Sequence, residues 1–503
     1  MKNHRLFLLA CASPLTLLCS HATAQDIVPP AIYTMTPTGV NLSDGTYTST
    51  DVDLAIGALK LERYHQGGER DPNNPAFGYR TSHNFDIYVT AANRTECSPG
   101  SCLTYKRPVV HIGRSAANFY QGGTVILPSN DDNMAGDLVL SSGAYVYTNK
   151  DGDVYTFSTS VSANGSSSSK RVANIQFTNG RRQDFYYSGN YLKVVIDSSG
   201  SAIVFEYNGS NLVSKACGYD TAATYVSSSS TCSGATLSVT YGYTSSKLTS
   251  VTDGLSGVTT YEYPTAGFCV KPPGYTTCKV ANTYSTGTPY PWQVVSQTLA
   301  DGAVWSYSYS GDGSTLRSPE QYVDLEPTFT ATVTDPNNKV STYSFVMSSP
   351  YSVTDANNRT TEYRFLGGCF AQYHYSETTP DCTGIHYGAA LVEATLPEGN
   401  KYQAQYSNVR RMVTQEKLIA KSGSSLADIT TSTSYPTDCS TSPNTPQNCA
   451  KPIWARDAKG NQTDYAHNSW GGITSEMQPA PSSGAARPLK LYDYVQKYAY
   501  VKN

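Results

Sequence analysis

One phrase recurs five times along this chain of 503 residues and constrains its fold more than any other feature. Each copy has an aspartate, a glycine or asparagine three or four positions later, an aromatic residue eight positions after the aspartate, and an aromatic residue or histidine two positions beyond that. The copies are Asp197, Gly200, Phe205 and Tyr207; Asp253, Gly257, Tyr261 and Tyr263; Asp335, Asn338, Tyr343 and Phe345; Asp355, Asn358, Tyr363 and Phe365; and Asp457, Gly460, Tyr465 and His467.

The residue types in this phrase predict one turn followed by one strand. An aspartate caps a turn through its carboxylate, and glycine or asparagine tolerates the positive φ that such turns require. Aromatic residues spaced by two lie on one face of the following strand. A repeat of this kind is typical of a sheet that grows by adding one hairpin beside the last.

Looser copies between the five predict that the same pattern continues through most of the chain. They begin at Asp151, Asn179, Asp301 and Glu398, each followed by glycine, and Asp335 and Asp355 lie 20 positions apart. The larger spacings therefore indicate insertions. Helical patterns are scarce, and Arg410 to Ala420 is interpreted as strand and loop because it continues an alternating segment. The sequence predicts an all-β fold of antiparallel strands and hairpins.

Ten cysteines form five local couples, and four of the couples lie between successive repeat units. The couples are Cys97 and Cys102, Cys217 and Cys232, Cys269 and Cys278, Cys369 and Cys382, and Cys439 and Cys449. At least one repeat strand separates each couple from the next, so nearest neighbours are expected to form five disulfides that staple loops. Zinc is the alternative, but no couple has the C-x2-C spacing or the nearby histidine of a zinc finger.

The first 24 residues have the pattern of a secretory signal peptide. Lys2 and Arg5 precede an apolar run, and Ala22 and Ala24 supply the small residues of a cleavage site before Gln25. A membrane anchor is the first alternative, although polar residues and a proline interrupt the apolar segment. A lipoprotein signal ending at Cys11 is the second, although its apolar core is short. We expect a secreted, periplasmic or cell-surface protein, a destination in which disulfides persist.

Charge and composition narrow the possible partners. Removing Lys2 and Arg5 with the leader changes the formal net charge from −3 to −5, which does not favour nucleic acid or anionic lipid. The chain has 40 Tyr against 13 Phe and 4 Trp. Such strands suit a sheet around a large or hydrated interior, and they are equally typical of extracellular adhesins.

The part from residue 25 to 147 lacks the repeat but carries a second set of motifs. Two alternating segments, Asp51 to Gly57 and Leu59 to Tyr64, predict two strands about a turn, and the block from Phe77 to Asp86 follows them. With these motifs the chain resembles the RHS/YD-repeat proteins, whose N-terminal section has similar D-L-x-I-x-G and F-G-x-G-W-x-H-N-Y-D blocks. Here Tyr79 stands where that family has a Gly-Trp pair, and Phe85 replaces a tyrosine. The five copies match the family's T-D-x-x-G-x-x-x-x-Y-x-Y repeat.

The resemblance implies a sheet that spirals into a hollow shell. In longer members of that family the shell encloses a C-terminal polypeptide, often a toxin, which is released by self-cleavage; animal teneurins use a similar shell in adhesion. This chain departs from the long form after Pro479 and Pro481, where one more Tyr-rich strand is expected at Leu491 to Val501. We therefore expect a partial, open shell. Its expected parts are a signal peptide (1–24), an N-terminal RHS-type β region (25–147), a YD-repeat sheet with disulfide-stapled insertions (148–478), and a Pro-rich hinge with a truncated final strand (479–503).

The sequence offers no catalytic, cofactor or metal residues to assign. Its histidines are scattered, and for His83 and His467 we expect packing or hydrogen bonding. No nucleophile elbow, phosphate loop or dinucleotide motif is present. Calcium is an alternative at Asp151-Gly152-Asp153 and at Asp131-Asp132-Asn133, but neither continues into a twelve-residue ligand loop.

Two classes of function remain open. The first is a non-catalytic scaffold that holds, displays or partly encapsulates a polypeptide cargo or cell-surface partner, as in a toxin-delivery shell. The second is a carbohydrate-binding surface protein or a glycan-active enzyme, because exposed aromatic residues stack on sugar rings. The face on which Tyr207, Tyr263, Tyr343 and Tyr363 lie separates the two. Burial in a continuous ladder favours the scaffold, and an exposed platform flanked by carboxylates favours the enzyme.

Overall fold

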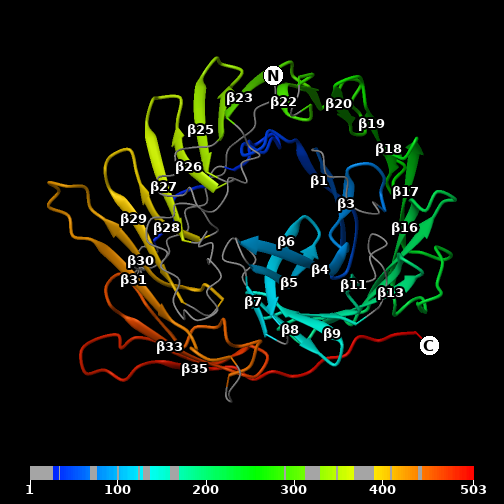
Figure 1. Cartoon of the computed structure of the whole chain (residues 1–503). Coiled ribbons are helices and arrows are strands. Elements are labelled where there is room, and N and C mark those ends of the chain that lie inside the picture. The colour runs from blue at the N-terminus through cyan, green and yellow to red at the C-terminus, as the bar shows by residue number, and fades with distance from the viewer. Residues whose placement is uncertain are drawn as a thin grey trace, which may run out of the picture.

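A computed structural model of the chain shows an all-β protein, which confirms the predicted fold class (Figure 1). It describes residues 27–32, 34–67, 76–98, 101–122, 125–128, 136–158, 169–287, 291–311, 329–346, 349–366, 390–407, 410–439 and 444–502. In these segments there is no helix that would be long and apolar enough to cross a membrane. The predicted signal peptide and the Asp131 segment lie outside them, as do Cys369 and Cys382.

Most of the chain forms one antiparallel sheet of 27 strands that curves through most of a circle (Figure 1). Neighbours in sequence are neighbours in the sheet, apart from β11, which belongs to another sheet. The sheet is open, because the described strands at its two edges, β8 and β35, share no hydrogen-bond ladder.

The strands of this main sheet are β8 (Asp137–Ser141), β9 (Ala144–Thr148), β10 (Val154–Phe157), β12 (Asn174–Gln176), β13 (Arg182–Ser188), β14 (Tyr191–Asp197), β15 (Ser201–Tyr207), β16 (Val213–Asp220), β17 (Leu237–Thr244), β18 (Lys247–Thr252), β19 (Val258–Glu262), β20 (Gly267–Lys271), β21 (Val280–Tyr284), β22 (Val294–Leu299), β23 (Val304–Gly311), β24 (Phe329–Thr334), β25 (Val340–Val346), β26 (Ser349–Thr354), β27 (Thr360–Leu366), β28 (Ala390–Thr395), β29 (Lys401–Tyr406), β30 (Val413–Ile419), β31 (Ile429–Ser434), β32 (Trp454–Arg456), β33 (Gln462–His467), β34 (Ile473–Met477) and β35 (Leu489–Leu491). β30 falls within the segment from Arg410 to Ala420 that was predicted as strand and loop.

The curvature has a repeated local cause. In eight strands the pairing register with the next hairpin shifts at an aromatic residue or histidine, which marks a β-bulge. The residues that follow the shift are Tyr187, Tyr207, Tyr243, Tyr284, Phe345, Phe365, Tyr406 and His467. A bulge bends its strand and increases the local twist. One bulge per hairpin therefore turns a flat ribbon into a curved one.

Two smaller sheets from the N-terminal part lie inside the curve (Figure 1). One contains β1 (Thr48–Ile56), β2 (Leu59–Gln66) and β3 (Thr81–His83), and the other contains β4 (Ile87–Ser98), β5 (Ser101–Ile112), β6 (Ser115–Gly122), β7 (Val125–Pro128) and β11 (Lys170–Arg171). β1 and β2 are the two strands predicted about a turn. β1 contacts β15, β16 and β17 of the main sheet.

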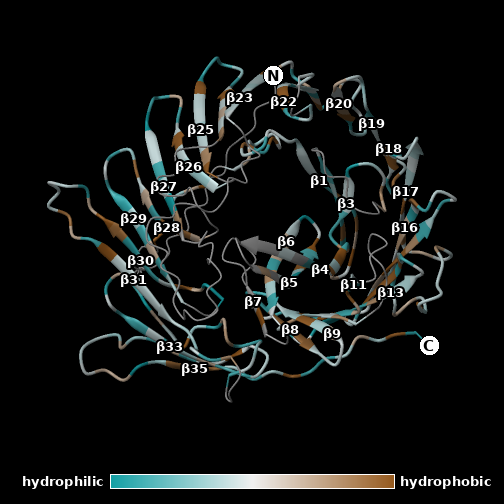
Figure 2. Cartoon of the chain, viewed as in Figure 1, coloured by the Kyte–Doolittle hydropathy of each residue, from teal (hydrophilic) through white to brown (hydrophobic). Residues whose placement is uncertain are grey.

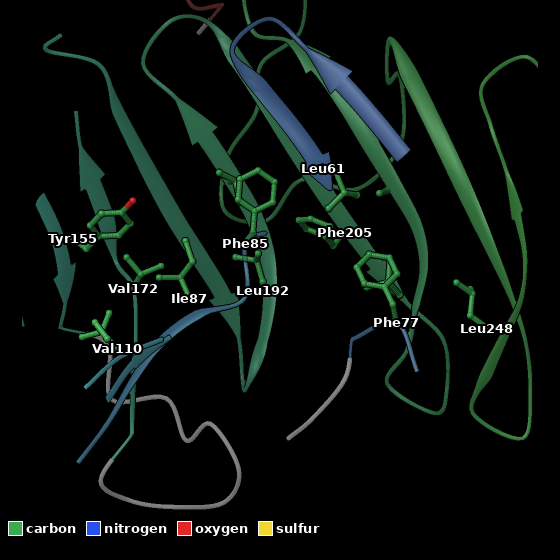
Figure 3. Packing of buried hydrophobic residues seen from close by; sticks show 14 of the residues in the cluster. Leu61, Phe77, Phe85, Ile87, Val110, Tyr155, Val172, Leu192, Phe205 and Leu248 are labelled. Atoms are coloured by element: carbon green, nitrogen blue, oxygen red, sulfur yellow. The ribbon is translucent and has the colours of Figure 1, made fainter. Parts of the chain in front are cut away.

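The main core lies between these inner sheets and the inward face of the main sheet. Figure 3 shows Leu61, Phe77 and Phe85 of the N-terminal part packed toward Leu192, Phe205 and Leu248 of the main sheet. Along the strands hydrophobic and hydrophilic residues alternate (Figure 2). That alternation places apolar side chains on the inward face. On β14 to β16 the opposite face is apolar as well, and Val194, Val204 and Tyr219 are buried there in a separate cluster.

Side-chain contacts join the first strands of the main sheet to the segments that precede β30 and β32. Arg410, at the start of the segment before β30, forms an ion pair of 2.5 Å with Asp137 of β8. Its Nη1 also donates to the Pro446 carbonyl at 2.5 Å, and Lys451 Nζ donates to the Asp151 carbonyl at 2.9 Å. Pro446 and Lys451 flank Cys449, which forms a disulfide with Cys439. The stapled loop thus contacts β8 through Arg410, which bonds both Asp137 and the Pro446 carbonyl.

The final strand is shorter than expected. β35 ends at Leu491, and residues 492–502 continue without strand pairing, so the prediction of a strand from Leu491 to Val501 is wrong. The tail instead crosses the outside of the sheet, where the Lys502 amide donates to the Thr221 carbonyl at 2.8 Å. Nearer to β35 the tail is held by the Tyr492 amide, which donates to the Thr474 carbonyl at 3.0 Å, and by the Tyr494 hydroxyl, which donates to the Ile473 carbonyl at 2.9 Å.

Candidate functional site

The repeat aspartates serve the turns of the main sheet. Asp355 Oδ1 accepts hydrogen bonds from the backbone amides of Asn357 and Arg359 at 2.8 and 3.0 Å. Hydrogen bonds from Arg359 also lower the pKa of the Asp355 carboxyl below its usual value. Asp197, Asp253, Asp335 and Asp457 accept from the amide two residues on in the same way. These carboxylates therefore serve as hydrogen-bond acceptors for the backbone amides of their turns.

Four of the five turns use the predicted residue for positive φ. Gly200, Asn338, Asn358 and Gly460 have φ values of 98°, 59°, 60° and 82°. In the remaining copy Ser256 has a φ of 66°, and Gly257 is not in the left-handed region. This turn has the same length as the others, because Asp253 Oδ1 accepts the amide four residues on, that of Gly257, as Asp335, Asp355 and Asp457 do in their turns. Ser256 therefore occupies the position that Asn338, Asn358 and Gly460 occupy in the other copies.

A recurring tyrosine hydrogen bond joins the two ends of five hairpins. Five tyrosine hydroxyls donate to the backbone carbonyl of the residue 15 positions upstream, at 2.7 to 3.0 Å. The pairs are Tyr187 to Val172, Tyr207 to Leu192, Tyr263 to Leu248, Tyr309 to Val294 and Tyr406 to Leu391. Burial raises the pKa of Tyr263 and of Tyr406 to about 12. Sequence reasoning missed this bond, although the constant spacing to an apolar residue was a signal for it.

The ladder aromatics are packed within the sheet. Phe205, Tyr261, Phe345, Tyr363 and Phe365 are buried, while Tyr207, Tyr263, Tyr343, Tyr465 and His467 are half-buried. Of the four tyrosines singled out from the sequence, Tyr363 is thus buried, and Tyr207, Tyr263 and Tyr343 are half-buried.

The structure joins three of the five predicted cysteine couples. Disulfides link Cys217 to Cys232, Cys269 to Cys278 and Cys439 to Cys449. The backbone places Cys97 opposite Cys102 across the β4–β5 hairpin, and the Cys97 side chain is outside the described residues. Among the residues that are described, no group of three or more His, Cys, Asp or Glu side chains is arranged to hold a metal ion.

The histidines of the N-terminal motifs lie in the core. His83 packs edge-on against Phe77, and His65 stacks on Phe268 with ring centroids 4.3 Å apart. Burial lowers the pKa of His65 to about 3 and that of His83 to about 4, so both are neutral near pH 7.

A buried ionic cluster fastens the inner sheet to the main sheet. Arg63 of β2 is 1% exposed, and its Nε lies 2.8 Å from Asp53 Oδ2. Arg63 Nη2 donates to the Tyr261 hydroxyl at 2.8 Å, and the Tyr241 hydroxyl donates to Asp53 Oδ2 at 2.9 Å. Arg63 and Asp53 of the inner sheet are thus hydrogen-bonded to Tyr261 and Tyr241 of the main sheet, which links the two sheets, whereas Arg63 Nη1 has no hydrogen-bond partner among the described residues.

The surface best placed to bind a partner is the inward face of β26 to β29. We call it the inner aromatic face, and it consists of Val353, Tyr363, Phe365, Leu391, Ala394, Tyr402 and Ala404. The chain's own residues 27–32 lie on it. Ile27, which is 7% exposed, packs into this cluster, and the Tyr363 hydroxyl donates to the Ala31 carbonyl at 2.8 Å.

An open cavity adjoins this face. Its volume is about 430 Å³, and its lining includes Tyr343, Tyr363, Asp355, Arg359 and Glu398. Tyr363 is shared between the cavity and the bound segment. The site therefore combines an apolar floor, a hydroxyl that donates to a peptide carbonyl, and a charged rim at the hairpin turns.

No protein-family model and no curated protein sequence matches the chain. Among solved structures, the Photorhabdus luminescens Tc holotoxin pore is similar with a TM-score of 0.35 and 11% identity, over 90% of this chain and 28% of that one. The TcdB2–TccC3 complex without its hypervariable C-terminal region gives a TM-score of 0.35 and 12% identity, over 80% of this chain and 22% of that one. The chain thus spans less than a third of the length of these neighbours. Neither similarity reaches the level at which a shared fold supports an inference about function.

Proposed function

We propose that the protein is a non-catalytic scaffold of the RHS/YD-repeat type that holds an extended polypeptide on its inner aromatic face. The disulfides support a destination outside the cytoplasm, where such bonds persist. The partner would be a polypeptide cargo or a cell-surface protein.

One observation carries this proposal: the inner aromatic face already holds a stretch of polypeptide. Residues 27–32 have no regular secondary structure, and they bind through one buried apolar side chain and one hydroxyl-to-carbonyl hydrogen bond. Recognition of an extended chain uses these two elements, backbone hydrogen bonds for affinity and pockets for side chains. A face that accepts one such segment has the chemistry to accept another.

The repeat aspartates and the tyrosine hydroxyls also support a scaffold role. The repeat aspartates are used as hydrogen-bond acceptors in turns, and the tyrosine hydroxyls donate within hairpins. Both groups build the sheet, and the inner aromatic face belongs to a cluster separate from the core that the inner sheets share with the main sheet.

Binding in trans of the chain's own segment tests the proposal. Ile27→Asp places a charge in the apolar cluster and should release residues 27–32 from the face. A fluorescent peptide with the sequence of residues 25–34 should then bind the I27D chain and bind the unaltered chain much more weakly, because its face is occupied. Fluorescence anisotropy measures both affinities.

A second substitution assigns the binding to this face. Tyr363→Phe in the I27D chain removes the donor to the Ala31 carbonyl and should weaken the peptide about fivefold. Tyr186→Phe, at an exposed tyrosine of β13, is the matched control and should leave the affinity unchanged. The proposed site would be refuted if the peptide did not bind the I27D chain, or if Tyr363→Phe left its affinity for that chain unchanged.

A further inference from the structure

The segment that lies on the inner aromatic face has a sequence that restricts its conformation. Val28 is followed by two prolines, Pro29 and Pro30. A proline ring fixes φ at about −65°, and a residue that precedes proline is driven from the helical region toward extended conformations. Residues 28–30 are therefore expected to form a polyproline II helix, a left-handed helix with about three residues per turn.

The burial of the segment repeats with that period. Ile27 is 7% exposed and Pro30 is half-buried, whereas the other four residues from 28 to 32 are exposed. Positions i and i+3 of a polyproline II helix share one face, and Ile27 and Pro30 form such a pair. A β-strand would instead place Ile27, Pro29 and Ala31 on one face. The exposure pattern therefore fits a polyproline II helix and does not fit a strand.

The backbone of the segment is not used in a ladder. No backbone-to-backbone hydrogen bond joins residues 27–32 to any other residue that the structure describes. Pro29 and Pro30 have no amide hydrogen to donate. The segment is instead held by a side chain, because the Tyr363 hydroxyl donates to the Ala31 carbonyl at 2.8 Å. A polyproline II helix has no internal hydrogen bonds, so its carbonyls accept from side chains in this way.

The face supplies the aromatic surface that such a helix requires. Tyr363, Phe365 and Tyr402 are buried members of the cluster that Ile27 joins. The Tyr402 hydroxyl donates to Glu416 at 2.8 Å within the sheet, whereas that of Tyr363 donates to the segment. Aromatic-lined grooves bind proline-rich segments because the preformed helix loses little conformational entropy on binding.

We propose that the inner aromatic face selects proline-rich polypeptides and binds them as a polyproline II helix, through an aliphatic residue and a proline three positions later. This assignment rests on the proposed function, because it names the class of polypeptide that the face holds. In the chain's own segment Ile27 and Pro30 occupy the two positions, and Tyr363 bonds the carbonyl of the residue that follows the proline.

Anisotropy titrations of the I27D chain with variants of the 25–34 peptide test this proposal. Pro30→Ala in the peptide removes a ring that faces the sheet and should weaken binding about tenfold. Pro29→Ala is the matched control, because it removes an exposed ring and should weaken binding only about twofold, through lost stiffness. Val28→Pro extends the helix at a position that is 78% exposed and should tighten binding about twofold.

A peptide in which valine replaces both prolines separates a proline-rich occupant from a strand. Valine keeps an apolar side chain and favours a strand, so this peptide should bind at least about tenfold more weakly than the original. Equal affinities of these two peptides, or equal losses from Pro29→Ala and Pro30→Ala, would overturn the polyproline assignment and leave the proposed function in place. If none of the peptides bound, the proposed function would fail as well.

The same two prolines in the full chain give a measurement that does not depend on Ile27→Asp. A chain with Pro30→Ala holds its own segment less tightly, so it should bind the unaltered peptide about fivefold more tightly than a chain with Pro29→Ala does. Equal binding by the two chains would contradict the assignment of Pro30 to the side of the helix that faces the sheet.

Discussion

At the scale of single residues, the fold depends on polar groups that hold the hairpin backbone, and in hairpins such as that of Asp197 and Tyr207 they hold it at both ends. An aspartate carboxylate caps the turn, and a tyrosine hydroxyl bonds the carbonyl at the start of the preceding strand. A half-buried hydroxyl without an acceptor lowers the free energy of unfolding, so each of these tyrosines stabilises its hairpin only when its hydrogen bond is formed. The repeat therefore stabilises the sheet through hydrogen bonds from its aspartate and tyrosine side chains as well as through apolar contacts.

Removing one rung hydroxyl should destabilise the protein measurably. Tyr207→Phe deletes the 2.7 Å bond to the Leu192 carbonyl and leaves that carbonyl without its donor. We expect the free energy of unfolding in urea to fall by about 1 kcal/mol. Tyr186→Phe, whose side chain is exposed, should change it by less than about 0.5 kcal/mol. Equal effects of the two substitutions would mean that the hydrogen bond from Tyr207 to Leu192 does not stabilise the protein.

The two core histidines should make the protein sensitive to acid. Their folded pKa values, about 3 for His65 and about 4 for His83, lie below the ordinary value of 6.5. The unfolded chain therefore binds more protons between pH 6.5 and those values, and stability falls as the pH drops below 6.5. At pH 5 each histidine should account for a loss of about 2 kcal/mol relative to pH 7.5.

His83→Phe separates this effect from general acid denaturation. The substitution keeps a ring beside Phe77 and removes the titrating group, so the difference in unfolding free energy between pH 7.5 and pH 5 should shrink by about 2 kcal/mol. Urea titrations at both pH values measure the change. The same pH difference in H83F and in the unaltered chain would mean that His83 does not titrate on unfolding.

At the scale of elements, hairpins were predictable and their partners were not. The Asp-x-x-Gly phrase specifies a turn and a strand locally, so the strands around Asp335 and Asp355 follow from sequence. The bond from Arg63 to Tyr261 joins residues 198 positions apart, and no local pattern predicts it. The same reason explains why the binding surface was missed, since Ile27 and Tyr363 meet only after the sheet has curved.

The buried Arg63 cluster should control how β1 and β2 dock on β17 and β19. Arg63→Met leaves Asp53 buried without its cation, and we expect a loss of about 3 to 5 kcal/mol. Asp53→Leu should have a similar effect. The double variant should be less destabilised than the sum of the two, because it leaves neither charge unpaired. Additive effects in chemical unfolding would contradict a direct pairing.

At the scale of the whole molecule, a curved sheet with two unpaired edges needs another means of closure. Edge strands expose unpaired backbone groups that promote association between molecules. Here the loop stapled by the disulfide from Cys439 to Cys449 reaches β8 through Arg410, and the C-terminal tail reaches Thr221. The closure is made by side chains and single hydrogen bonds, which are easier to open than a ladder.

Loss of the stapled loop should loosen the first strands selectively. Replacing Cys439 and Cys449 with serine frees the loop, and amide hydrogen exchange in β8 to β10 should accelerate while exchange in β20 to β25 is unchanged. Replacing Cys269 and Cys278, a staple elsewhere on the sheet, is the control and should leave β8 to β10 unaffected. Unchanged exchange in β8 to β10 after the first replacement would show that the loop does not close the gap.

The most direct test of the scaffold as a whole is hydrogen exchange of the I27D chain with and without the peptide of residues 25–34. We expect the peptide to slow exchange in β26 to β29, the strands of the inner aromatic face, and nowhere else in the main sheet. Peptide binding that slows exchange evenly around the sheet, or that leaves β26 to β29 unchanged, would contradict the claim that this face holds a polypeptide.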